Sequence, residues 1–177
     1  MKTIDKYLFQ ALDNYPYWLE GTIESLDYAF SYDSKNTMIL CLYGRIQAEQ
    51  LMNYEEAKSY FQEALSINIH ALEVYPYYLQ TLILNEDYEE AQKLIDFALT
   101  IKGINKADIY IKKAILLEAQ QEFKKALKEI KLAKLYSVQH DYDSGISDVE
   151  KRIKSKMNLL ENKKSKKGGK DSKKKSK

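Results

Sequence analysis

Apolar positions recur with helical spacing along most of the chain, and three segments repeat one arrangement. Each reads aromatic residue, two charges, Ala, three residues, bulky apolar residue, two residues, Ala, and the segments are 53–65, 87–99 and 122–134. In the middle segment, four apolar residues are spaced by three, four and three positions, so they form one stripe along a helix: Tyr88, Ala91, Ile95 and Ala98. The first alanines of the segments lie 34 and 35 residues apart. This period predicts a helical repeat.

Each of these predicted helices follows another stretch of helical periodicity, so the unit is a helix, a short turn and a helix. Alanine in the stripe lets a neighbouring helix axis approach to about 8–10 Å. Asn53 and Asp87 are favourable N-cap residues, and a glutamate follows each of them three positions later, as in a capping box. The second helix of each unit is therefore predicted to begin at its aromatic residue.

This pattern resembles the tetratricopeptide repeat, which combines W-x-x-L-G-x-x-Y in a first helix with A-x-x-x-F in a second. Residues 40–47 match the first half, with Gly44 at the position of close approach, and Ala57 with Phe61 matches the second half. The first repeat carries an additional residue near Leu51 and Met52, where the family has a single Gly. The resemblance implies an all-α fold, a right-handed α-solenoid with repeats at about 38–70, 72–104 and 107–137.

Both ends of the array carry weaker helical patterns. Residues 1–34 are predicted to form a degenerate repeat, with a first helix over Ile4–Leu12 and a second helix that begins near Pro16. Its expected stripe is Thr22, Leu26, Ala29 and Tyr32. Residues 145–161 are predicted to form a terminal helix that covers the open end of the array, through Ile146, Val149, Ile153, Met157 and Leu160. The Lys-rich segment 162–177 is expected to be disordered, because it has almost no apolar area to bury.

Composition and charge argue against disulfide-rich, metal-binding, secreted and membrane-spanning proteins. The chain has 177 residues, 45% of them hydrophobic, and a formal net charge of +2. Residues 162–177 contain nine Lys and one Asp, so the remaining 161 residues carry a net charge of −6. A single cysteine excludes an internal disulfide framework and a Cys-based zinc cluster, and two histidines that lie far apart in sequence argue against a His-rich metal site. Early charges argue against a secretory signal and no long apolar run is present, so we expect a cytoplasmic protein.

No motif indicates catalysis. The sequence has no phosphate-binding glycine loop, no dinucleotide fingerprint, no zinc-protease motif and no nucleophile elbow. Adjacent acidic residues such as Glu89 and Glu90 diverge on a helix, and their position favours interaction with the helix dipole. We therefore expect no catalytic residue, no cofactor and no metal site, and a protein that is not an enzyme.

The resemblance implies that first helices line a concave groove, and we expect that groove to bind a peptide or helix of a partner protein. Some of the groove positions alternatively pack on neighbouring repeats. The residues implied are Cys41, Arg45, Glu49, Tyr77, Gln80, Ile83, Leu84, Asp108, Lys112, Ile115 and Glu118.

Two alternatives involve other partners. The Lys-rich segment 162–177 would contact nucleic acid or an anionic membrane through charge alone, because no aromatic residue interrupts its lysines. The same composition also suits a tail that only solubilises the protein. Self-association into a homo-oligomer is compatible with the sequence as well.

Overall fold

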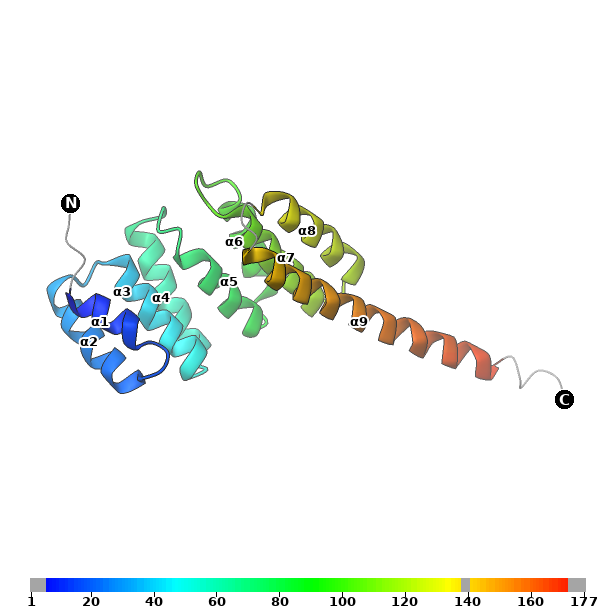
Figure 1. The fold of residues 1–177 in the computed structure, drawn as a ribbon, viewed down its shortest axis with the longest axis horizontal. Helices are drawn as coiled ribbons and strands as arrows, with labels where there is room; N and C mark the ends of the chain where they lie inside the picture. The colour runs from blue at the N-terminus through cyan, green and yellow to red at the C-terminus, as the bar shows by residue number, and fades with distance from the viewer. Residues whose placement is uncertain (1–5, 138–140, 172–177) are drawn as a thin grey trace. The chain divides into compact units, whose positions relative to one another are not determined.

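The computed structural model describes residues 6–137 and 141–171, with side chains for 6–137 and 145–160. Every regular element in these ranges is helical, which confirms the all-α prediction (Figure 1). The chain divides into two compact units, residues 1–104 and 105–177.

Unit 1 is a series of helical hairpins. Its elements are α1 (Lys6–Asn14), α2 (Leu19–Tyr32), α3 (Thr37–Arg45), the π-helical η1 (Ile46–Gln50), α4 (Tyr54–Ile67), α5 (Val74–Leu84) and α6 (Tyr88–Ala98). The pairs α1–α2, α3–α4 and α5–α6 pack as neighbours, α4 also packs on α5, and α3 lies along α5. This is the arrangement expected of stacked helix–turn–helix repeats.

The alanine stripes form the packing seams, as the repeat pattern predicted. In α4, α6 and the later helix α8 (Phe123–Tyr136), nine stripe residues are at most 1% exposed: Ala57, Phe61, Ala64, Ala91, Ile95, Ala98, Ala126, Ile130 and Ala133. Tyr88, the first member of the predicted α6 stripe, is partly exposed. Gly44 is the matching small residue on α3, because a Cβ atom there would lie 2.6 Å from the Phe61 ring. Glycine therefore permits the closest approach in this hairpin.

The turn inside each predicted repeat contains a residue in the left-handed region. Met52, Glu86 and Gln121 have φ values of 53°, 62° and 62°. In the second repeat the amide of Glu86 donates to the carbonyl of Ile83 and the amide of Asp87 to that of Leu82, which is the Schellman pattern. The third repeat repeats both bonds, from Gln121 and Glu122.

The additional residue of the first repeat lies in the helix, not in the turn as we expected. The closing bond of this turn runs from the Asn53 amide to the Gln47 carbonyl and spans six residues, against five in the other two repeats. The helix before it widens into the π-helical η1. A π-helical turn takes up one inserted residue while the following turn keeps its shape.

The two predicted N-caps behave differently. Asn53 accepts a hydrogen bond from the Glu56 amide at 3.4 Å. Asp87 occupies the N-cap position of α6 but makes no capping bond through its side chain. Its carboxylate instead accepts from Lys58 Nζ and Asn85 Nδ2, each at 2.7 Å. Asp87 therefore links two repeats.

Two expectations for the N-terminal pair are wrong. Pro16 precedes α2, because the amides of Tyr17 and Trp18 donate to the Asn14 carbonyl and close a turn around it. Tyr32 is 72% exposed, since it is the last residue of α2, and its ring stacks on Tyr7 with 6.1 Å between ring centres. The rest of the stripe is buried as expected: Thr22, Leu26 and Ala29.

Unit 2 packs three helices: α7 (Lys106–Ala119), α8 and α9 (Asp141–Asp171). Ile146, Val149 and Ile153 of α9 are at most 9% exposed and join the core that α7 and α8 form. Met157 is partly buried and Leu160 is 38% exposed. The start of the predicted stripe therefore attaches α9 to the unit, and its end extends beyond the core.

The helix α9 is longer than the predicted 145–161. It begins at Asp141, and its backbone remains helical over 162–171, which we expected to be disordered. Residues added to an existing helix need no new nucleation, and lysine has a favourable helix propensity. The side chains from residue 161 onward and all of 172–177 lie outside the described part of the chain, so the character of that segment stays a prediction.

Candidate functional site

One guanidinium in unit 1 is held between two aromatic rings. The Cζ atom of Arg45, at the end of α3, lies 4.6 Å from the ring centre of Tyr15 and 4.2 Å from that of Tyr77 on α5. These distances are within the range of cation–π interaction. Glu49 of η1 completes the group, with Oε1 3.4 Å from Arg45 Nε.

The four side chains of this Arg45 cluster restrain one another. The Tyr15 hydroxyl donates to the Glu49 carboxylate, which leaves that carboxylate bonded to two residues of the cluster. Burial, helped by the bond to Glu49, raises the pKa of Tyr15 to about 12. The phenol therefore remains a donor at neutral pH. The side chains of Arg45 and Glu49 are still 22% and 40% exposed, so a fixed pair of opposite charges reaches solvent.

The structure thus brings together three of the predicted groove residues, Arg45, Glu49 and Tyr77. It adds Tyr15, which sequence reasoning did not select. The signal that could have found it is its spacing, because Tyr15 precedes its partner Glu49 by 34 residues, one repeat length. Residues one period apart meet when neighbouring repeats stack in register.

The other groove candidates of unit 1 differ in exposure. Cys41 and Ile83 are 4% and 6% exposed and belong to the core. Burial raises the pKa of the Cys41 thiol to about 12, which keeps it uncharged and unreactive. Gln80 is partly exposed, and Leu84 is 50% exposed at the end of α5. Of this set, Leu84 is the apolar side chain that a partner could reach.

In unit 2, the predicted residue Glu118 is used within the chain. Its carboxylate is 3% exposed and accepts from Arg152 Nε at 2.8 Å, Arg152 Nη2 at 2.6 Å and Lys156 Nζ at 2.7 Å. Burial alone would raise the pKa of Glu118, but the bonds from the two cations outweigh it and hold the pKa below its usual value. Glu118 therefore anchors α9 on α7.

The three remaining candidates lie on α7. Ile115 packs against the core of unit 2. Asp108 is partly buried, which raises its pKa, and it accepts a hydrogen bond from Asn105 Nδ2 at 3.1 Å. Lys112 is partly exposed. The charge of Lys112 acts against the rise in the pKa of Asp108, so these two candidates interact electrostatically.

The described residues offer neither a metal site nor a membrane-spanning helix. They contain no group of three or more His, Cys, Asp or Glu side chains placed to hold a metal ion. None of their helices combines the length and the apolar character needed to cross a membrane.

Comparison with known proteins identifies the fold. No family model matches the sequence, and no curated protein does. A solved structure from the functional characterisation of Pseudomonas aeruginosa pilF is similar, with a TM-score of 0.62 and 18% sequence identity. The match covers 87% of this chain and 74% of that one. Since pilF is a tetratricopeptide-repeat protein, the chain has the fold that its repeat pattern predicted.

Proposed function

We propose that this chain is a non-catalytic scaffold, which binds a segment of a partner protein on the α3–α5 face of unit 1. Helical repeats of this kind expose such faces for protein partners. The observation that carries the proposal is the Arg45 cluster, because Arg and Tyr are the residue types that dominate binding energy at protein interfaces. Its rings and its carboxylate hold the cation in place before a partner arrives, which lowers the entropic cost of binding.

An apolar contact would come from Leu84, which follows Tyr77 on α5 by seven residues and so shares its side of the helix. A partner segment with an apolar side chain for Leu84 and a carboxylate or backbone carbonyl for the exposed edge of Arg45 fits this face. The buried candidates Cys41 and Ile83 would support the face from below without touching the partner.

The test is affinity purification from the native cell with the variant Arg45→Met, Leu84→Glu. Its expected result is the loss of specific co-purifying proteins at unchanged helicity. Leu84 is chosen over its neighbour Ile83 because Ile83 is buried, so a glutamate there would disturb the fold itself. The matched control is Leu135→Glu on α8, which changes a 74% exposed leucine in unit 2. Equal recovery of partners with both variants would reject the α3–α5 face.

A second candidate function is contact with nucleic acid or an anionic membrane through residues 105–177. The observation that favours it is charge, since this range contains 21 basic and 10 acidic residues, a net of +11. Such binding would weaken steeply with salt. The contribution of residues 162–177 is tested by comparing retention on DNA at low salt between the full chain and a chain that lacks these residues. Equal retention would exclude the tail as the binding element.

A further inference from the structure

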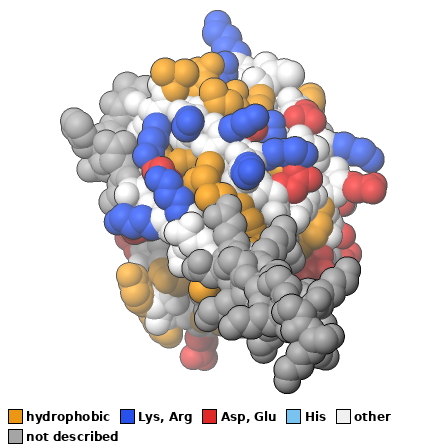
Figure 2. Space-filling view, turned by 90° about the vertical axis from the view of Figure 1, so that its right-hand side faces the viewer, with side chains coloured by type: hydrophobic (Ala, Val, Ile, Leu, Met, Phe, Trp, Pro, Cys, Tyr) orange, Lys and Arg blue, Asp and Glu red, His pale blue; other side chains and the backbone are white. Residues whose placement is uncertain are grey.

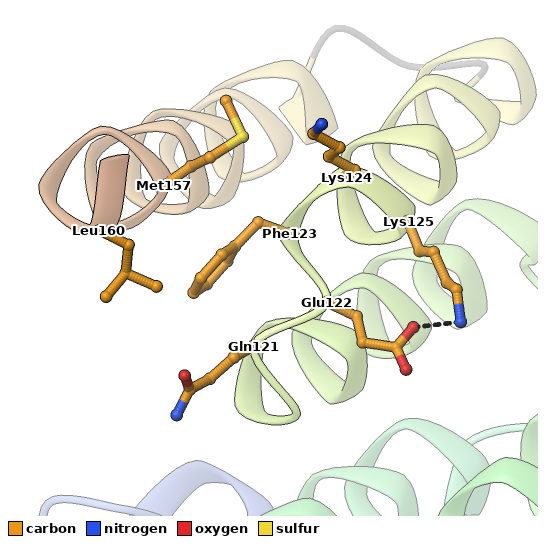
Figure 3. A pocket seen from close by; sticks show the side chains of 7 residues that line it. All are labelled: Gln121, Glu122, Phe123, Lys124, Lys125, Met157 and Leu160. Carbon is orange, nitrogen blue, oxygen red and sulfur yellow. Dashed lines mark ion pairs between the residues drawn. The ribbon is translucent and has the colours of Figure 1, made fainter. Parts of the chain in front are cut away.

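The end of α9 forms an apolar cleft with the start of α8. Phe123 points toward α9, which contributes Met157 and Leu160 to the same cleft (Figure 3). The turn before α8 closes the cleft with Gln121 and Glu122, and the volume is about 460 Å³. The cleft exists because the apolar stripe of α9 continues past this turn.

Two lysines at the start of α8 lie on one side of this α8–α9 cleft. Lys124 and Lys125 line it, and Lys125 pairs with Glu122, whereas Lys124 forms no ion pair with a described residue. On the face of the molecule drawn in Figure 2, basic side chains lie around hydrophobic ones. An apolar cleft with a basic rim is complementary to an acidic surface that presents apolar side chains.

Unit 1 presents a surface of that kind on α2. A hollow of about 690 Å³ is lined by Leu19, Glu20, Ile23, Glu24 and Asp27. The leucine and the isoleucine are partly exposed, Glu20 and Glu24 are exposed, and neither glutamate pairs with a cation among the described residues. Asp27 accepts a hydrogen bond from the Tyr43 hydroxyl.

The charges of the two units are opposite overall. Residues 1–104 contain 7 basic and 16 acidic side chains, a net of −9, against +11 for residues 105–177. Copies of this chain therefore attract one another when unlike units meet, and the attraction extends over about 8–10 Å at moderate salt.

We propose that the α8–α9 cleft docks a second copy of this chain, through the acidic α2 surface of that copy. The contact is head-to-tail, so each copy has one end free to continue the chain of subunits. A nucleic acid would use the lysines but leave the apolar lining without a role. A membrane surface would reach Leu160, which is 38% exposed, but not the ring of Phe123, which is recessed and only 8% exposed.

Sedimentation velocity of the full chain over a range of concentrations tests this contact. The average mass should rise with concentration at low salt and less at high salt. Dependence on concentration distinguishes association between copies from contacts within one chain. An average mass that stays monomeric at all concentrations would overturn the proposal.

Charge reversal tests which surfaces meet. Glu20→Lys with Glu24→Lys, and separately Lys124→Glu with Lys125→Glu, should each raise the dissociation constant about tenfold or more. An equimolar mixture of the two variants should restore dimers, because each supplies the intact surface that the other lacks. Failure of the mixture to associate would contradict the proposed pairing.

Matched controls change the same charges elsewhere in each unit. They are Glu63→Lys with Glu89→Lys in unit 1, and Lys106→Glu with Lys131→Glu in unit 2, all at exposed positions. We expect both controls to associate like the natural chain. Equal loss of association in the controls would show unspecific attraction and reject the α2 and α8–α9 surfaces. Leu160→Gln should also weaken association, because this side chain lines the cleft. Unchanged association of the Leu160→Gln variant would count against docking in the cleft.

Discussion

At the scale of single residues, small side chains decide how closely the helices of this protein approach. Nine stripe residues of α4, α6 and α8 are almost completely buried, and six of them are alanine. Gly44 goes one step further, because no Cβ atom fits between its backbone and the Phe61 ring. At the six alanines and at Gly44, the size of the residue is therefore limited by the distance between helices.

Gly44→Ala should destabilise the protein by about 1–3 kcal/mol, since the added methyl group would overpack the α3–α4 seam. Thermal unfolding measures the effect. Gly145→Ala is the matched control, because a Cβ atom there meets no heavy atom within 4 Å. The control should stabilise α9 by about 0.5–1 kcal/mol through helix propensity. Equal melting temperatures for the two variants would refute the role of Gly44.

At the scale of elements, the turns of the second and third repeats share one geometry although their sequences differ. Glu86 and Gln121 adopt the left-handed conformation that favours glycine, and both end a Schellman motif. The same scale includes the attachment of α9, where one buried carboxylate on α7 binds two cations. These contacts determine where each helix stops and which neighbour it joins.

Glu86→Gly and Gln121→Gly should each stabilise the protein by about 0.5–1 kcal/mol, because glycine removes the steric cost of positive φ. Glu89→Gly is the control, since the same change inside α6 should cost about 1 kcal/mol. Urea unfolding of the three variants checks the signs. Destabilisation by all three would mean that the turn side chains contribute more than the conformation costs.

The pairing of Glu118 predicts a dependence of unit 2 on pH. Because the folded-state pKa of Glu118 lies below its usual value, its contribution is present above the ordinary pKa of a glutamate and is lost as the pH falls through the lowered one. Glu118→Gln should therefore weaken α9 at neutral pH and have little effect in strong acid. Hydrogen exchange of α9 amides at several pH values measures this. An effect of equal size at both extremes would contradict the ionic attachment.

At the scale of the whole molecule, the chain combines two compact units of opposite charge. One core cluster draws its residues from α1, α2, α3 and η1, and another from α7, α8 and α9. The charge difference arises because the acidic residues concentrate before residue 105 and the lysines after it. The two surfaces proposed to join copies of the chain follow this division, because the acidic α2 surface lies in unit 1 and the α8–α9 cleft lies in unit 2.

Local stability should therefore respond unit by unit. Gly44→Ala should lower hydrogen-exchange protection in α3 and α4 much more than in α7 and α8, and Glu118→Gln should do the reverse. The physical reason is that repeat units interact mainly with their neighbours. A uniform loss of protection in both units from either substitution would indicate a single cooperative core.

The repeat period, the helical class and the buried stripes could all be predicted from the amino-acid pattern, because spacing on a helix directly determines which side chains share a face. The same pattern could not show that an additional residue forms a π-helical turn, that Asp87 bonds to Lys58, or that Glu118 binds α9. It also missed Tyr15 as the second ring on Arg45. Those contacts join residues about 30 positions apart, and their existence depends on the distances and angles at which neighbouring hairpins pack, which are properties of the assembled fold and not of any one segment.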